Sequence, residues 1–249
     1  MTGQVKRMLD FRTRISGLCI LMLGACSHDR GPAAACGPGV LGTSRVQVVS
    51  LETDYVPDLL AENEVVLTFD DGPHPNRTKR VLDLLDDQCV QATFFLVGRE
   101  AKDFPGLVRE IRSRGHTLGG HSWDHPHLSK LPVAGAVSNI EAGMEAIEAA
   151  TGEDVLMFRF PFIDTSPELS DAVREAGYLD VTATADGADW LDEPPEASVG
   201  RILNKLDAGG RRGIILLHDP FGASDRRTRK LLEALKAENY RVVALQPAG

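Results

Sequence analysis

Residues 64–97, EVVLTFDDGPHPNRTKRVLDLLDDQCVQATFFLV, contain the pattern from which the fold can be inferred. The segment begins with a largely apolar run at 64–69 and ends with a second one at 92–97. Such runs are typical of strands that are buried on both faces of a parallel sheet. Between them, apolar residues such as Val81 and Leu85 recur at the three- and four-residue spacing of an amphipathic helix. The segment therefore predicts two parallel strands joined by a helix.

The same alternation of strand-like and helix-like segments continues to residue 245. Further strands are expected at 117–120, 157–160, 179–183, 213–217 and 241–245. Helices are expected at 78–87, 100–114, 132–150, 167–176, 196–206 and 225–238. This alternation predicts an α/β fold, a sheet or barrel of about seven parallel strands built from strand–helix–strand units. Residues 40–63 are expected to form an irregular lead-in.

Composition and charge exclude several classes of protein. Hydrophobic residues make up 43% of the 249 residues and charged residues 25%, which excludes a chain that is disordered throughout. The formal net charge is -9 and the chain has no basic block, which argues against nucleic acid as a partner. No apolar run reaches the roughly 20 residues that span a bilayer, so a multi-pass membrane protein is excluded as well.

Residues 1–25 are predicted to be a secretory signal peptide. Four basic residues precede an apolar run at 15–25, ISGLCILMLGA, which ends in small residues directly before Cys26. This ending resembles the signal of bacterial lipoproteins, in which the cysteine after the cleavage site is lipidated. We therefore expect a periplasm-facing lipoprotein of the bacterial cell envelope, anchored by a lipid on Cys26; simple secretion is the alternative. Residues 26–63 would form the lipidated tether and lead-in, and residues 64–249 the folded domain.

Two further cysteines would remain in the mature chain, Cys36 and Cys89. Disulfides persist in the oxidising compartments outside the cytoplasm. We expect a Cys36–Cys89 bridge that joins the tether to the domain; two free buried thiols are the alternative. A four-cysteine zinc site is not expected, because the sequence has no C-x-x-C pair.

Polar motifs follow several of the predicted strands, at the edge of an α/β sheet where active sites gather. They are TFDDGP (68–73), HSWDH (121–125), RFPF (159–162), DGADW (186–190) and LLHD (216–219). The two tryptophans of the chain, Trp123 and Trp190, fall inside these motifs and could stack on sugar rings or simply pack.

The histidines and carboxylates of these motifs predict a metal site. His121 and His125 are four residues apart, a spacing that can place two imidazoles on one face of a helical turn. With Asp70 or Asp71 they would form a set of two histidines and one carboxylate, which leaves positions on a metal open for water and substrate. Solvated surface histidines are the alternative.

Two other charged residues at strand ends need partners. A buried Arg159 would need an anion, for which Asp70 is a candidate, with a helix glutamate as the alternative. His218 could be a satisfied core residue, or it could act as an acid if a carboxylate lies beside it in a cleft.

Together and in this order, the five motifs resemble those of NodB-type polysaccharide deacetylases (carbohydrate esterase family 4), over residues 64 to 245. The resemblance implies a distorted (β/α) barrel. It also implies that Asp71, His121 and His125 bind a divalent metal, zinc or alternatively cobalt. Asp70 would be the general base, and Arg159 would orient it.

The remaining roles follow from the last three motifs. His218 would be the general acid and Asp189 the carboxylate that pairs with it. The main-chain N–H of Phe162 would bind the oxyanion, and Phe162 itself stands where the family usually has tyrosine.

The resemblance implies removal of N-acetyl groups from an N-acetylglucosamine-containing glycan: peptidoglycan, chitin or chitooligosaccharide. The site residues alone would also suit an O-acetyl esterase of the acetylxylan type. A catalytically silent carbohydrate-binding lipoprotein is the other alternative, but it predicts loss of a ligand or of the acid, and all these positions are filled.

Overall fold

The computed structural model describes residues 37, 39–53 and 55–248. The predicted signal peptide, the lipidation site at Cys26 and the tether up to Cys36 lie outside the described residues. The signal, the lipid anchor and the Cys36–Cys89 bridge therefore stay predictions, and so does the division of the chain at residue 64.

The centre of the fold is a sheet in which all strands pair in parallel. The strands are β1 (Thr43–Val49), β2 (Glu64–Asp70), β3 (Thr93–Leu96), β4 (Thr117–Gly120), β5 (Met157–Phe158), β6 (Leu179–Asp180), β7 (Ala185–Asp186), β8 (Gly213–His218) and β9 (Arg241–Pro247). From β2 the sheet extends through β3, β4 and β5 to β6 in one direction, and through β8 to β7 in the other. No pairing within the described residues joins β6 to β7, so the barrel is open, and the predicted distorted (β/α) barrel is confirmed.

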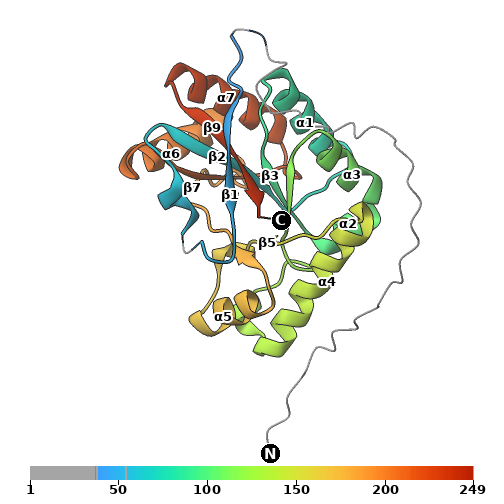
Figure 1. Ribbon diagram of the computed structural model, residues 1–249. Helices are drawn as coiled ribbons and strands as arrows, with labels where there is room; N and C mark the ends of the chain where they lie inside the picture. Colours follow the sequence, from blue (N-terminus) through green and yellow to red (C-terminus); the bar gives the residue numbers. More distant parts are fainter. Residues whose placement is uncertain (1–36, 38, 54, 249) are drawn as a thin grey trace, which may run out of the picture. The chain divides into compact units, whose positions relative to one another are not determined.

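Helices cover the outside of the curled sheet (Figure 1). They are α1 (Arg77–Asp87), α2 (Gly98–Asp103), α3 (Pro105–Ser113), α4 (Val133–Thr151), α5 (Pro167–Glu175), α6 (Pro195–Ala208) and α7 (Ser224–Ala237), with short 3-10 turns at Val56–Leu59, Leu128–Lys130 and Pro161–Ile163. None of the helices in the described part of the chain is long and apolar enough to cross a membrane.

Two hydrophobic clusters lie on the two faces of the sheet. Val65, Leu67 and Phe69 of β2 belong to the larger cluster, which also contains the apolar faces of the helices. Val66 of the same strand belongs to the second cluster. This alternation is expected because successive strand residues point to opposite faces. The second cluster fills the interior of the barrel, and residues of β1 and β9 contribute to it.

Several predicted elements are corrected by the structure. Residues 40–63, expected to be irregular, contain β1 and a 3-10 turn, and β1 pairs with β9 along its length. The single helix expected at 100–114 is two helices, α2 and α3. Phe104 has non-helical backbone angles and Pro105 has no N–H to donate, so the helix cannot continue through this point. The strand β7 was not predicted at all.

Candidate active site

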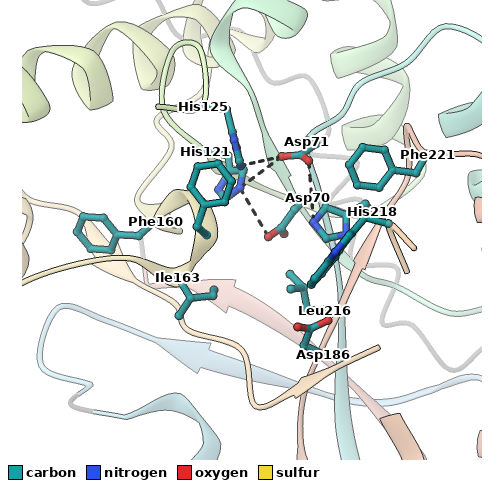
Figure 2. A pocket seen from close by; sticks show the side chains of 12 residues that line it. Asp70, Asp71, His121, His125, Phe160, Ile163, Asp186, Leu216, His218 and Phe221 are labelled. Carbon is teal, nitrogen blue, oxygen red and sulfur yellow. Dashed lines mark ion pairs between the residues drawn. The ribbon is translucent and has the colours of Figure 1, made fainter. Parts of the chain in front are cut away.

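The five polar motifs meet at one edge of the sheet, where the strands have their carboxyl ends. Asp70 is the last residue of β2, and it lies directly beside His218, the last residue of β8. Figure 2 shows the side chains that gather at this edge. A cavity of about 490 Å³ opens there, lined by Asp70, Asp71, His121, His125, Phe160, Phe162, Ile163, Asp186, Trp190, Leu216, His218 and Phe221.

Asp71, His121 and His125 form a group that could hold a metal ion. One ligand atom from each lies within 4.8 Å of the others. Oδ1 of Asp71 is 3.5 Å from Nε2 of His121 and 3.2 Å from Nε2 of His125. This buried oxygen has no hydrogen-bond partner within the described residues, although both imidazoles face it. A divalent cation could bind here, because an unpaired buried carboxylate oxygen lies beside two imidazole nitrogens. The residues therefore fit a metal.

The second nitrogen of His121 fixes the orientation of its ring. Nδ1 lies 2.8 Å from the carbonyl oxygen of Arg159, so Nε2 is the atom directed at Asp71. Burial, together with the charge of His125, lowers the pKa of His121 well below its usual value. The ring is therefore neutral, as a ligand must be.

The spacing of the two histidines suggested a shared helical turn. The structure differs, because residues 121–125 form a loop. Ser122 and His125 have φ values of 66° and 58°, in the left-handed region. The start of α2 holds this loop: the N–H of Gly98 donates to the carbonyl of Ser122, at 2.9 Å. On the other side, a Cβ at Gly143 of α4 would lie 2.5 Å from the same oxygen, so only glycine allows this approach.

Asp70 lies beside the metal group and is paired with Arg159. Nη1 of Arg159 donates to Oδ1 of Asp70 at 2.8 Å, and both side chains are buried. The partner of the arginine is thus the strand-end carboxylate and not a helix glutamate. Burial raises the pKa of Asp70 to about 6, although the charge of Arg159 opposes this rise.

Main-chain oxygens and one ring fix the arginine itself. The guanidinium of Arg159 donates to the carbonyls of Val181 and Thr182, at 2.8 and 3.1 Å. It also lies over the ring of Phe95, 4.2 Å from the ring centre. A cation with this many contacts holds Asp70 in one position.

His218 faces the cavity from the opposite side and is paired with Asp189. Nδ1 of His218 is 2.7 Å from Oδ1 of Asp189, and the main-chain N–H of His218 donates to Oδ2 at 2.9 Å. Burial alone would lower the pKa of His218, but the hydrogen bond and charge of Asp189, with the nearby Asp70 and Asp71, raise it to about 9. Its Nε2 lies 3.9 Å from Oδ2 of Asp71.

Apolar side chains make up much of the cavity wall. Phe162 and Trp190 are 56% and 50% exposed, so their surfaces are available to a ligand. Trp123, in contrast, does not line this cavity; it lies beneath the ammonium of Lys102 on the outside of the barrel. Sequence reasoning missed Phe221, whose ring centre is 4.9 Å from that of His218. Its position three residues after His218 is the sequence feature that could have identified Phe221 as part of the site.

Comparisons with known proteins identify relatives of the chain. Residues 60–181 match the family model for polysaccharide deacetylase. The chain is 34% identical over 194 residues to a chitooligosaccharide deacetylase of Azorhizobium caulinodans, a match that covers 76% of this chain and 90% of that protein.

Solved structures are similar as well. A peptidoglycan deacetylase of Bdellovibrio bacteriovorus superimposes with a TM-score of 0.76 and 27% identity, covering 87% of this chain and 62% of that one. A CE4 family pseudoenzyme of Bacillus anthracis superimposes with a TM-score of 0.67 and 25% identity, covering 73% of this chain and 63% of that one. The chain thus spans less than two thirds of the length of either solved relative.

Proposed function

Because the chain belongs to the polysaccharide deacetylase family, we propose that it is a metal-dependent hydrolase that removes N-acetyl groups from an N-acetylglucosamine-containing glycan of the cell envelope. The chain is classed with the hydrolases that act on linear amide bonds, as the deacetylases named above are. One observation carries the finer proposal: a paired carboxylate and a paired imidazole flank the three metal-binding side chains in one cavity.

Zinc is the proposed metal, held by Asp71, His121 and His125. Two imidazoles and one carboxylate suit zinc and also other divalent ions such as cobalt. When bound, the ion would supply Lewis acidity, which polarises a carbonyl oxygen and makes water more acidic.

Asp70 is proposed as the general base. Its Oδ1 is bound to Arg159, while Oδ2 lies 3.8 Å from Nε2 of the proposed ligand His121, so this carboxylate borders the place where water would be deprotonated. The role of Arg159 would be to keep Asp70 ionised in spite of its burial and to hold it in place.

His218 is proposed as the general acid that protonates the departing amine. An amine is a poor leaving group unless it is protonated, so cleavage of an amide needs such an acid. Asp189 would keep the imidazole of His218 charged and would fix the orientation of its ring. Phe162 lines the same cavity, and its main-chain N–H would stabilise the oxyanion of the tetrahedral intermediate.

The site residues alone would suit either an ester or an amide, and two features support an amide on an amino sugar. An ester would not need the complete His218–Asp189 pair, which is present. The exposed rings of Phe162 and Trp190 at the cavity suit the faces of sugar rings. Peptidoglycan, chitin and chitooligosaccharides all offer N-acetylglucosamine, and relatives named above act on the first and last of these.

Acetate release tests the proposal. The protein would be stripped of metal, reloaded with zinc and incubated with N-acetylglucosamine oligomers, peptidoglycan and acetylxylan, with Asp70→Asn as the control. Zinc-dependent acetate from an amino-sugar substrate, absent with Asp70→Asn, is the expected result. Release from acetylxylan alone would make the protein an esterase. No release from any substrate, with zinc bound, would instead place it with silent relatives such as the pseudoenzyme.

We also propose that the protein acts outside the cytoplasm, anchored by a lipid on Cys26 and with a Cys36–Cys89 bridge. The sequence of the first 26 residues supports the anchor. Labelled palmitate should be incorporated by the unaltered chain and not by Cys26→Ala. Non-reducing peptide mapping should recover the bridge, and free thiols at both positions would exclude it.

A further inference from the structure

Asp219 is a buried carboxylate that the proposed mechanism does not use. It directly follows His218 at the end of β8 and is 0% exposed. Its Oδ2 accepts a hydrogen bond from the hydroxyl of Thr78, while Oδ1 is buried with no hydrogen-bond partner among the described residues. Burying a carboxylate with a single neutral donor costs stability. Packing alone therefore does not account for an aspartate at this position.

Asp219 touches the loop that carries the metal-binding Asp71. A Cβ at Gly72 would lie 2.5 Å from Oδ1 and 2.6 Å from Oδ2 of Asp219, so the carboxylate rests directly against the main chain of Gly72. Gly72 follows Asp71, whose φ of 71° lies in the left-handed region that few residues with side chains adopt. A shift of the Asp219 carboxylate would therefore reach Asp71 through one peptide unit.

Thr78 joins this carboxylate to the rest of the loop. It is fully buried in the first turn of α1, and its Oγ1 accepts the N–H of His74 at 2.7 Å while it donates to Asp219. A second tie lies beside the first, because Arg77 donates to the carbonyl of Pro220 at 2.6 Å. The loop after β2 and the loop after β8 are thus braced against each other.

We propose that Asp219 and Thr78 are positioning residues for the metal ligand Asp71. The inference rests on the proposed function. The brace holds the strained backbone at Asp71 so that its Oδ1 stays within reach of both histidines. Because Asp219 adjoins His218, the same brace sets the distance between the metal group and the proposed acid. Neither residue touches substrate; both act through Asp71.

Cobalt(II) binding to the full-length protein tests this proposal without depending on activity. Affinity would be measured by competition with a chelator, and ligand geometry by the visible absorption of the bound cobalt. Thr78→Val removes the hydroxyl and keeps the branched shape, whereas Thr78→Ser keeps the hydroxyl. Thr93→Val is the matched control, since Thr93 is equally buried on β3 and its hydroxyl has no partner in the described chain.

We expect Thr78→Val to weaken cobalt binding by about 10- to 100-fold and to change the visible spectrum, as losses around a metal ligand do. Thr78→Ser and Thr93→Val should bind like the unaltered protein. Asp219→Ala should weaken binding similarly, and combining it with Thr78→Val should add little, because the two act as one unit.

Unchanged affinity and spectrum in folded Thr78→Val would overturn the inference, and this variant decides the matter even if Asp219→Ala does not fold. An equal loss in Thr93→Val would also overturn it, since the effect would then be general to buried threonines. If the unaltered protein bound no cobalt, the proposed metal site itself would fail and the inference with it.

Discussion

Strand β2 has a carboxylate at each end, and strand β4 has a histidine directly before it and another directly after it; in both cases the surroundings at the two ends differ. β2 begins with Glu64 and ends with Asp70, and each carboxylate is paired with an arginine. Glu64 accepts hydrogen bonds from Arg45, which lower its pKa to about 2 despite partial burial. Asp70 is deeper, and burial raises its pKa to about 6 despite its own arginine.

The histidines beside β4 make the same contrast. His116, before the strand, is fully buried; its Nδ1 accepts the N–H of Ala92 at 3.2 Å and its ring lies edge-on to Phe94. His121, after the strand, is equally buried but directs Nε2 at Asp71. Parallel strands bring their carboxyl ends and following loops to one edge, so of these two histidines only His121 lies beside the other proposed metal ligands. Position along the strand, and not residue type, thus separates structural from functional groups.

The largest expected effect contrasts the two carboxylates of β2. Asp70→Asn should lower the turnover of acetate release by about 10²- to 10⁴-fold, because it removes the proposed general base. Glu64→Gln should leave turnover close to that of the unaltered enzyme, because Glu64 lies at the opposite end of the strand. Steady-state kinetics on an N-acetylglucosamine oligomer would measure both. Equal losses of turnover in the two variants would contradict the functional distinction between the two ends of β2.

The next effect contrasts the two histidines. His121→Asn should weaken cobalt binding by at least about 100-fold, since losing a ligand costs more than losing a supporting group. His116→Asn should not change it, because the asparagine Oδ1 can still accept the N–H of Ala92. Chelator competition measures both variants, and metal loss in His116→Asn would contradict the assignment of that residue to the fold alone.

A smaller effect concerns stability at the amino end of β2. The pKa of Glu64 falls from 4.5 to about 2 on folding, so its ion pair stabilises the protein fully above pH 4.5 and loses this contribution as the pH falls towards 2. Because Arg45 is partly exposed, Glu64→Gln should lower the free energy of unfolding by about 1–2 kcal/mol at pH 7. Urea titrations at pH 7 and pH 3 should show this difference shrinking at pH 3; a constant difference would contradict the ion-pair explanation.

The last effect, of similar size, is a slope of stability with pH that His116 produces. Burial lowers its pKa from 6.5 to about 4, so between these values the unfolded chain binds a proton that the folded chain does not. Stability should therefore fall as the pH falls through this window, by about 1–2 kcal/mol from pH 6.5 to 5. In His116→Asn this part of the slope should vanish. Unfolding curves at pH 6.5 and 5 would reveal it, and an identical slope in both proteins would argue against a neutral buried His116.

Among the strands, those that the sequence predicted most clearly are buried on both faces. β2 and β8 are buried along their whole length and consist mostly of apolar residues, so their pattern is clear. β1 was missed because it lies at the edge of the sheet, with partly exposed residues such as Arg45 and Gln47 that resemble a loop. β7 consists of two residues and has no pattern to detect. Edge strands and very short strands depend on their neighbours and not on their own sequence.

The candidate site was predictable in its membership but not in its geometry. The five motifs predicted that Asp71, His121 and His125 lie together, and in the structure one ligand atom from each lies within 4.8 Å of the others. The backbone of the histidine loop was not foreseeable, because its left-handed residues are imposed by α2 and by the close approach of Gly143. A role for Asp219 could not be predicted either, because its hydrogen-bond partner Thr78 is 141 positions away in the sequence.

The pairing of β9 between β1 and the start of β2 has a consequence for the order of assembly. The last strand in the sequence occupies the place between the first two, pairing Val242 with both Thr43 and Val65. Among the described residues, β1 pairs with no strand other than β9, so its strand pairing must wait until residues 241–247 have been synthesised. Contacts this distant in sequence slow folding, because a long loop must close before they form. Late pairing of this kind would suit the proposed signal peptide, because an exported chain crosses the membrane before it folds.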